Sequence, residues 1–273
     1  MMRAMFLRGS RLVLLCCATA GALPIHADGS SVMLEALTWT ELRDRVREGR
    51  TTIIVPIGAT EQNGPHMTLG KHNRRVALLA EKIALSLGNA VVAPVIAYVP
   101  EGGIDPPTAH MRFAGTITVP SATFVGVLES AANSFRRHGF RDIVFLGDHG
   151  GYQQDLRRAA DRLNRAWATQ PSRAHAIPEY YDVVATAYPE LLRQRGFADA
   201  EIGSHAGLAD TSLMLALDPA YVRADRLASA TPPGRTEGVA GDPRRASAEA
   251  GRLGVELIVA RTVSAIRKSE ARP

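Results

Sequence analysis

Three short segments of the chain combine histidine and carboxylate side chains with glycine, a mixture that suits metal-dependent hydrolysis. They are GATEQNGPHMTLGKHN (residues 58–73), GDHGGYQ (residues 147–153) and GSHAGLADTS (residues 203–212). Imidazole and carboxylate ligands suit Zn²⁺, Mn²⁺ or Fe²⁺. Water bound to such an ion loses a proton near neutral pH, so the three segments predict a hydrolytic nucleophile that needs no cysteine.

Two of these segments directly follow apolar, β-branched runs. Residues 51–57 (TTIIVPI) and residues 142–146 (DIVFL) each have the pattern of a buried strand. Helical patterns alternate with such strands along the chain, which predicts an α/β fold with a mostly parallel sheet covered by helices on both faces. Ligands in such folds bind beyond the carboxyl ends of the strands, so we expect the polar segments to meet there.

The remaining elements are predicted from apolar periodicity, capping residues and glycine or proline breaks. Thr38 and Glu41 fit a capping box, and Asn73 is the expected N-cap of the helix that follows it. Helices are predicted at residues 38–49, 73–88, 121–138, 186–194, 211–217 and 247–269, with another ending at residue 167. Further strands are predicted at residues 90–98, 116–119 and 174–183, and loops at residues 100–112 and 229–245.

The N-terminus has the features of a secretory signal peptide. Arg3, Arg8 and Arg11 precede the apolar residues 12–22, which are followed by small residues and a cleavage site expected after Ala27, with Ala20 and Ala22 as alternatives. The apolar stretch is short for a permanent membrane anchor, which is the alternative interpretation. We therefore expect residues 1–27 to be removed, residues 28–273 to form one domain, and the mature protein to be periplasmic or secreted.

Removal of this segment changes the global properties of the chain. Both cysteines, Cys16 and Cys17, lie within it, so the mature protein would have no disulfide, thiolate ligand or cysteine nucleophile. Three arginines and no acid leave with it, which lowers the net charge from +5 to +2. The chain also lacks a Lys/Arg stripe with interleaved aromatic residues, so we expect no nucleic-acid partner and, after cleavage, no membrane association.

In order and spacing, the three segments resemble the creatininase (creatinine amidohydrolase) family. Family members carry a Glu-Gln-His-Gly-Pro-His stretch that ends in Gly-Thr-Asp, then Asn-Gly-His-Gly-Gly-Asn, then His-Ala-Gly followed by Glu-Thr-Ser. Residues 109–116 (AHMRFAGT) resemble a fourth element of the family, so the likeness extends over about residues 55–217. The resemblance implies a three-layer α/β/α sandwich, a homo-oligomer that is often a hexamer, and hydrolysis of cyclic or linear amides with two divalent metal ions.

The family's metal ligands carry over only in part. Glu61 and His149 match a ligand glutamate and a ligand histidine. Asn63, however, stands where a ligand histidine is expected, and His72 stands where an aspartate bridges the two metals. A neutral imidazole has one free lone pair and cannot bridge two ions as a carboxylate does. Gly151 stands where creatininase proper has a further carboxylate.

These departures favour a single-metal site, although one or two ions per chain remain open. Glu61, His72 and His149 would make a His₂–carboxylate set for Zn, Mn or Fe. Asp210, which matches a family glutamate, is predicted to be a fourth ligand or a general base, and Asp148 to orient an imidazole. Three further histidines are predicted to contact substrate or to stabilise a developing oxyanion: His66, His110 and His205.

The leading functional hypothesis is a metal-dependent amidohydrolase that acts on a small non-peptide amide or lactam. A second hypothesis is a non-catalytic relative that binds a small molecule and has lost the dinuclear site, which Asn63 and His72 favour. A third is a metal-independent hydrolase that uses Ser204 or Ser212 with His205, but neither serine lies in a nucleophile-elbow sequence.

Overall fold

The computed structural model describes residues 31–228 and 232–271. The expected signal peptide and the first residues of the expected domain lie outside this range. The strands are β1 (Thr52–Ile57), β2 (Ala90–Val92), β3 (Asp142–Gly147) and β4 (Arg173–Ala176). The helices are α1 (Trp39–Arg47), α2 (Lys71–Leu87), α3 (Ser121–Arg137), α4 (Gln153–Ala166), α5 (Glu179–Ala185), α6 (Ala187–Gln194), α7 (Asp199–Ile202), α8 (Leu208–Leu217), α9 (Ala224–Leu227) and α10 (Ala248–Glu270), with short 3₁₀ turns that include η2 (Ala109–Arg112) and η3 (Gly150–Tyr152). Among the described helices, none is long and apolar enough to cross a membrane.

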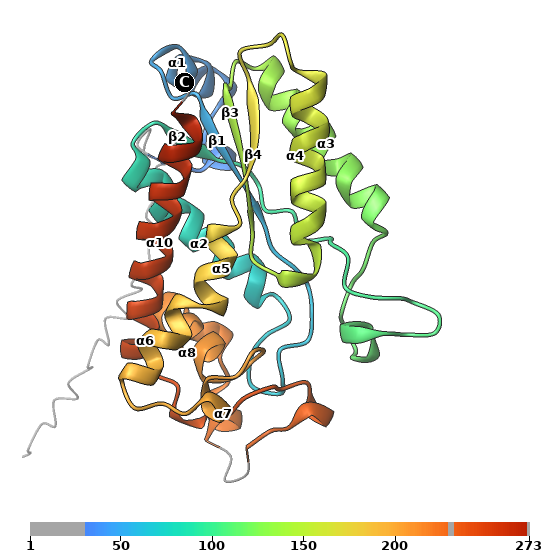
Figure 1. Cartoon of the computed structure of the whole chain (residues 1–273), viewed down its shortest axis with the longest axis vertical. Helices are drawn as coiled ribbons and strands as arrows, with labels where there is room; N and C mark the ends of the chain where they lie inside the picture. The colour runs from blue at the N-terminus through green and yellow to red at the C-terminus, as the bar shows by residue number, and fades with distance from the viewer. Residues whose placement is uncertain (1–30, 229–231, 272–273) are drawn as a thin grey trace, which may run out of the picture.

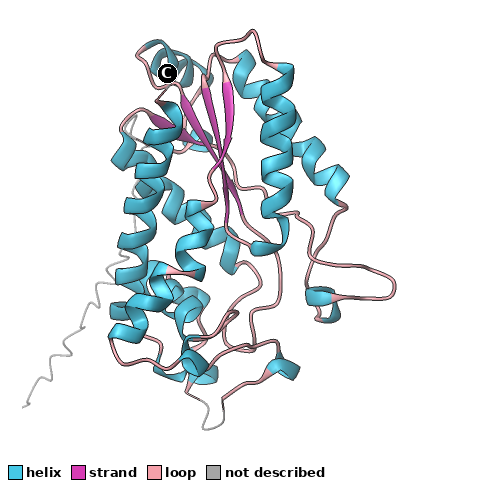
Figure 2. Cartoon of the chain, viewed as in Figure 1, coloured by secondary structure: helices cyan, strands magenta, loops and turns pink. Residues whose placement is uncertain are grey.

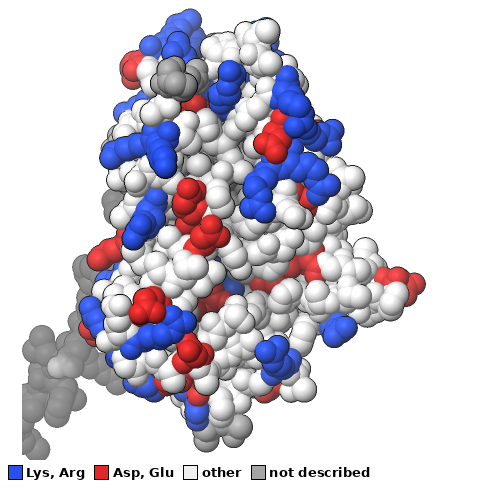
Figure 3. All heavy atoms as spheres, in the orientation of Figure 1, with Lys and Arg blue, Asp and Glu red and all other residues white. Residues whose placement is uncertain are grey.

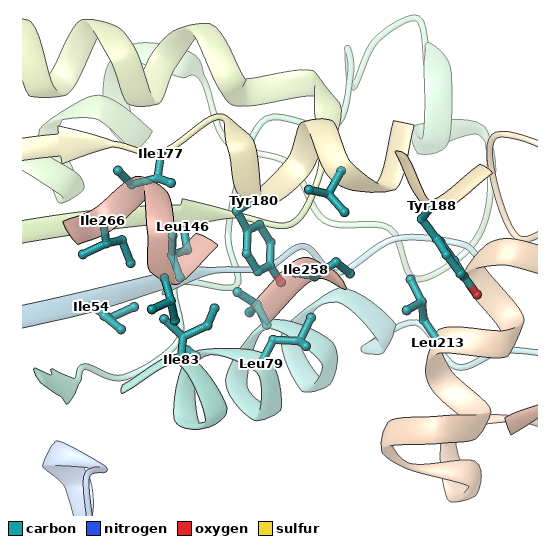
Figure 4. Close-up of a cluster of buried hydrophobic side chains, with 14 of the residues drawn as sticks. Ile54, Leu79, Ile83, Leu146, Ile177, Tyr180, Tyr188, Leu213, Ile258 and Ile266 are labelled. Atoms are coloured by element: carbon teal, nitrogen blue, oxygen red, sulfur yellow. The ribbon is translucent and has the colours of Figure 1, made fainter. Parts of the chain in front are cut away.

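The four strands form one parallel sheet in the order β2-β1-β3-β4 (Figures 1 and 2). Alternate residues of the central strands pack into two separate hydrophobic clusters. Ile54 of β1 packs with α2 and α10 on one face, whereas Ile53 and Val55 pack with α3 and α4 on the other. Figure 4 shows the first cluster, where Leu79 of α2 and Ile258 of α10 approach the sheet. The predicted α/β/α sandwich is confirmed.

The carboxyl ends of β1 and β3 lie next to each other. Ile57 pairs with Gly147 at the last position of the two strands, so residues 58–70 and 148–152 leave the sheet side by side. The third polar segment reaches the same region through α8, and an isolated bridge joins His205 to Ala240. The three segments identified in the sequence are therefore brought to one edge of the sheet.

A projecting loop, defined here as residues 100–119, connects the segment after β2 to α3. In Figure 1 it extends to the right of the body and carries η2. The predicted strand at residues 116–119 lies within this loop and is not a strand. The backbone N–H of Ile117 donates to the carbonyl of Thr60 at 2.9 Å, but this single bond does not extend into a strand pairing.

Other predicted boundaries also differ from the structure. The strand expected at residues 90–98 ends at Val92, because Pro94 soon follows and cannot donate a ladder hydrogen bond. Residues 174–183 contribute β4 and then turn into α5. Asn73 is not an N-cap, since α2 already begins at Lys71; its side chain accepts from the backbone N–H of Ala59 at 3.0 Å instead. The capping box of Thr38 is confirmed.

Helices α8 and α10 cross in close contact at two glycines. A Cβ atom on Gly251 would overlap the backbone carbonyl of Ser212, and one on Gly254 would lie 2.7 Å from Leu213 Cδ2. Neither position has room for a side chain. This contact fixes α8, and with it the third polar segment, against the long C-terminal helix.

His66 joins the segment after β1 to α8 in the interior. Its side chain is fully buried, and Nε2 lies 3.0 Å from Thr211 Oγ1. Its Nδ1 atom has no hydrogen-bond partner. Burial lowers the pKa of His66 to about 4, since the interior disfavours the charged imidazole.

We expect Gly251→Ala to lower the free energy of unfolding by about 1–3 kcal/mol or more, because the new methyl group meets a backbone oxygen that cannot rotate away. Gly126→Ala in α3 is the matched control. A Cβ there has nothing within 4 Å, so alanine should stabilise the helix by about 0.5–1 kcal/mol. Chemical denaturation measures both changes. Equal unfolding free energies for Gly251→Ala and the wild type would contradict the described helix contact.

The buried His66 should make stability depend on pH between about 6.5 and 4. In this window the unfolded chain binds a proton at residue 66 that the folded chain does not, so acidification favours unfolding. The loss from this group approaches about 3 kcal/mol at the acid end and is absent above pH 6.5. His66→Gln, which does not titrate, should show a correspondingly flatter decline. Parallel pH profiles of unfolding free energy for the two proteins would rule this contribution out.

Candidate metal centre

Four side chains present possible ligand atoms that all lie within 4.8 Å of one another: Glu61, Glu101, His110 and His149. Glu61 follows β1 and His149 follows β3, whereas Glu101 and His110 belong to the projecting loop. Glu61 Oε2 lies 3.3 Å from His110 Nε2 and 3.4 Å from His149 Nε2. Glu101 Oε1 lies 3.4 Å from His149 Nδ1. We call these four residues the metal cluster.

The spacing within the metal cluster fits a divalent ion better than it fits hydrogen bonds. Separations of 3.3–3.4 Å exceed the usual N–H···O range. Two ligands bound at about 2.0–2.1 Å to a tetrahedral ion lie roughly 3.3 Å apart. Glu61 Oε2 and both carboxylate oxygens of Glu101 are buried without a hydrogen-bond partner. Such buried, unpaired oxygens are costly unless a cation or a proton compensates them.

The protonation of the metal cluster also suits a cation. Burial lowers the pKa of His149 to about 3 and lowers that of His110, so both rings are neutral at physiological pH and can act as ligands. Burial raises the pKa of Glu101 to about 9, and the charge of Glu61 adds to this shift. Without an ion, one of the two carboxyl groups therefore carries a proton.

His72 lies beside the metal cluster and is committed to two carboxylates. Its Nε2 is 2.5 Å from Glu61 Oε1, and its Nδ1 is 2.7 Å from Asp148 Oδ2. This arrangement orients Glu61 so that its other oxygen faces the cluster. The charge and hydrogen bond of His72 outweigh burial and hold the pKa of Glu61 well below its usual range. The predicted ligand role of His72 would need one of these contacts to break.

Asp148 contacts the His72 ring, as the orienting role predicted for it requires. Besides His72, it accepts hydrogen bonds from Arg75 Nε at 2.8 Å and from the Tyr180 hydroxyl at 2.7 Å. The charge of Arg75 outweighs burial and lowers the pKa of Asp148. The carboxylate therefore stays charged in the interior and fixes the His72 ring.

Asp210 lies at the far side of the same polar network. One oxygen accepts from Arg75 at 2.6 Å, and the other accepts from Lys71 at 3.2 Å and from the backbone N–H of Ala206 at 2.9 Å. Burial is outweighed by Lys71 and Arg75, which lower the pKa of Asp210 well below its usual range. A role as metal ligand or general base, as predicted, would require Asp210 to leave these partners.

His205 lies between the metal cluster and a pocket. Its Nδ1 is 3.9 Å from Glu61 Oε1, and its Nε2 is 3.0 Å from the carbonyl of Gln62. The Gln62 side chain also lies 3.0 Å from His110 Nδ1, so it holds both rings. The pocket has an empty volume of about 540 Å³, and its lining residues are Tyr181, Val184, Ala185, Pro189, Ile202, Gly203, Ser204, His205, Ala209 and Asp210. This position suits the substrate contact predicted for His205.

The other predicted residues lie outside the metal cluster. His66 is buried against α8, as described above. Asn63 is fully buried, and its Nδ2 donates to the backbone carbonyls of Glu61 and Thr68, which shapes the loop. Ser212 accepts a hydrogen bond from the backbone N–H of Ser247 and caps the contact with α10, which makes it a poor nucleophile.

Glu101 was not predicted from the sequence. It is a single acid in an irregular, Gly/Pro-rich loop, with no spacing that links it to the histidines. Its burial is the signal that identifies it, and burial depends on how the loop folds back.

The surface around the site is acidic. Figure 3 shows acidic atoms exposed beneath α4, where the projecting loop leaves the body, whereas basic residues gather on the upper part of this face.

The chain is similar in sequence to known hydrolases over most of its length. A family model described as "Creatininase: Creatinine amidohydrolase" matches residues 35–266. The creatinine amidohydrolase of Pseudomonas putida is 29% identical over 260 residues, which is 87% of this chain and 97% of that protein. The mycofactocin precursor peptide peptidase of Mycolicibacterium smegmatis is 29% identical over 228 residues, 76% of this chain and 81% of that protein.

Solved structures agree with these sequence matches. A structure described as "Creatininase Mn" superimposes with a TM-score of 0.74 at 28% identity and covers 89% of this chain and 100% of its own. A mutant creatininase of the Zn–Zn type gives 0.73 at 28% identity, with 89% and 99% coverage. The fold, the ordered motifs and the family model agree, and the chain belongs to the creatininase family.

Proposed function

We propose that this protein is a metal-dependent amidohydrolase. The observation that carries the proposal is the metal cluster, in which three buried carboxylate oxygens without partners face two neutral imidazoles. It lies at the carboxyl edge of a parallel sheet, where such folds bind ligands. Relatives named as an amidohydrolase and a peptidase support hydrolysis as the reaction class.

Zinc or manganese is the proposed ion, supported by the names of the similar creatininase structures. Glu61, His110 and His149 would hold it, with Glu101 as a further carboxylate. When bound, such an ion supplies a water of near-neutral pKa and polarises a carbonyl group. We propose one ion per chain, because neither nitrogen of His72 is free and Asn63 presents only a neutral amide oxygen where a second ion would need a stronger ligand.

The chain's own residues would orient the substrate. His205 would contact the amide, because it lines the pocket and its Nδ1 lies 3.9 Å from Glu61 Oε1 of the metal cluster. Burial lowers the pKa of His205 to about 4, so the ring acts as a neutral hydrogen-bonding group rather than as a cation. The apolar pocket walls would exclude water from the other half of the substrate.

The substrate proposed is a small cyclic or linear amide. The Pseudomonas relative is named for creatinine, whereas the mycobacterial relative is named for a peptide, and both are similarly identical to this chain. The prediction of a non-peptide C–N bond therefore stays a prediction, and candidate substrates include short peptides. We further propose that the enzyme is exported and assembles as a homo-oligomer, which the N-terminal segment and the family resemblance respectively support.

The second candidate is a protein of this family that binds a small molecule without hydrolysing it. The favouring observation is that both ring nitrogens of His72 contact carboxylates, and that Asn63 offers a second ion only a neutral amide oxygen, which is a poor ligand for zinc-like ions. This candidate and the hydrolase differ in whether metal binding is needed for the function.

The purified mature protein, made without a histidine tag, should hold about one zinc or manganese ion per chain. His149→Ala should abolish binding, because it removes a ligand at the rigid end of β3, whereas the exposed His138→Ala should not. Plasma mass spectrometry measures the metal content. Release of amine from amide, lactam and dipeptide substrates should be lost with a chelator and in His149→Ala. Absence of metal after incubation with either ion would exclude the hydrolase and leave the binding protein.

Replacing His72 with glutamine distinguishes an orienting residue from a ligand. As an orienting residue its loss should weaken metal affinity about 10- to 100-fold while one ion per chain still binds at saturation. Calorimetric titration with zinc gives both the dissociation constant and the stoichiometry. A variant that binds no zinc at any concentration would instead support His72 as a direct ligand.

A further inference from the structure

The projecting loop is long for a connection in a compact domain. It spans residues 100–119, all of which the structure describes, and η2 is its one regular element. Loops longer than about 12–15 residues without secondary structure are usually functional. Figures 1 and 2 show it standing away from the two helical layers. Its length and its position beside the metal cluster indicate a role at the site.

The base of the projecting loop is anchored, whereas the tip is held by its own contacts. At the base, Glu101 N–H donates to Thr118 Oγ1 at 2.9 Å, and Val119 N–H donates to the carbonyl of Val99 at 3.2 Å. At the tip, Thr108 and Gly103 bond to each other at 2.7 and 3.0 Å, and Ile104 is 69% exposed. The tip therefore gains little from packing, and the arm that returns through His110 depends on contacts at the site.

Two members of the metal cluster belong to this loop. Glu101 is 3% exposed, and neither of its carboxylate oxygens has a hydrogen-bond partner. His110 Nε2 faces Glu61 Oε2 at 3.3 Å. The closed loop thus brings a second carboxyl group into a buried space beside Glu61, where both groups can be ionised only if a cation compensates them.

We propose that a divalent cation, coordinated by Glu101 and His110 together with Glu61 and His149, holds the projecting loop closed over the site. This inference rests on the metal site of the proposed function. A closed loop offers the ion four ligands, whereas an open loop leaves it Glu61 and His149. The ion binds the closed form more tightly, so it shifts the loop toward that form by the ratio of the two affinities.

Hydrogen–deuterium exchange of the full mature chain tests this proposal. The protein is freed of metal by dialysis against a chelator and is then titrated with zinc. Peptides that cover residues 102–115 should exchange at least tenfold more slowly with saturating zinc. Glu101→Gln keeps the shape of the side chain but removes a ligand charge. It should still bind zinc, with an affinity about 10- to 100-fold weaker, and its loop should remain in fast exchange at saturation.

Asp105→Asn is the matched control, because Asp105 is an exposed carboxylate at the tip of the same loop. It should behave as the wild type does. Zinc binding by the wild type without slower loop exchange would overturn this inference and leave the metal site intact. Failure of the wild type to bind zinc in calorimetry would overturn both. Equal protection of the loop in Glu101→Gln and in the wild type would show that Glu101 does not hold the loop closed, which would overturn the inference. A thermal melt confirms that the variant is folded.

Discussion

The site depends on a chain of buried ionic contacts that runs behind the metal cluster. Glu61, His72, Asp148, Arg75, Asp210 and Lys71 follow one another in contacts of 2.5 to 3.2 Å. Removing one partner of such a buried pair typically costs about 3–5 kcal/mol, because the other charge is left without compensation. The network thus constrains every element that contributes to it. Those elements are the segments after β1 and β3, helix α2, and the start of α8.

This network explains why an imidazole can occupy a place between two carboxylates. Each ring nitrogen of His72 faces a carboxylate oxygen, at 2.5 Å from Glu61 and 2.7 Å from Asp148. Arg75 and Lys71 supply two positive charges among three acids, Glu61, Asp148 and Asp210. The acids behind the metal cluster are thereby partly compensated before any ion binds. A divalent ion then has to compensate only the outward oxygen of Glu61 and the carboxylate of Glu101.

The sequence identified the site residues whose place in the fold follows from the strand just before them. Glu61 and His149 directly follow buried strands, so the parallel sheet alone brings them together. The role of His72 could not be predicted in the same way, because it depends on Asp148 and on helix α2, which are distant in the chain. Glu101 carries no periodicity or motif, and its place depends on how the projecting loop folds back. Asn73 shows the same limit at small scale, since a tertiary contact with Ala59 replaces the local cap that propensity favours.

The metal cluster is divided between a rigid half and a movable half. Glu61 and His149 follow neighbouring strands whose register is fixed by six residue pairs, from Thr52 with Asp142 to Ile57 with Gly147. A slip of one residue would shift them by roughly 3.3 Å, which is more than the length of a bond to a metal. Glu101 and His110 stand on a loop that no strand register constrains. Substitutions in the projecting loop can therefore change the number and type of ligands, while Glu61 and His149 remain in place as two ligands positioned by the sheet.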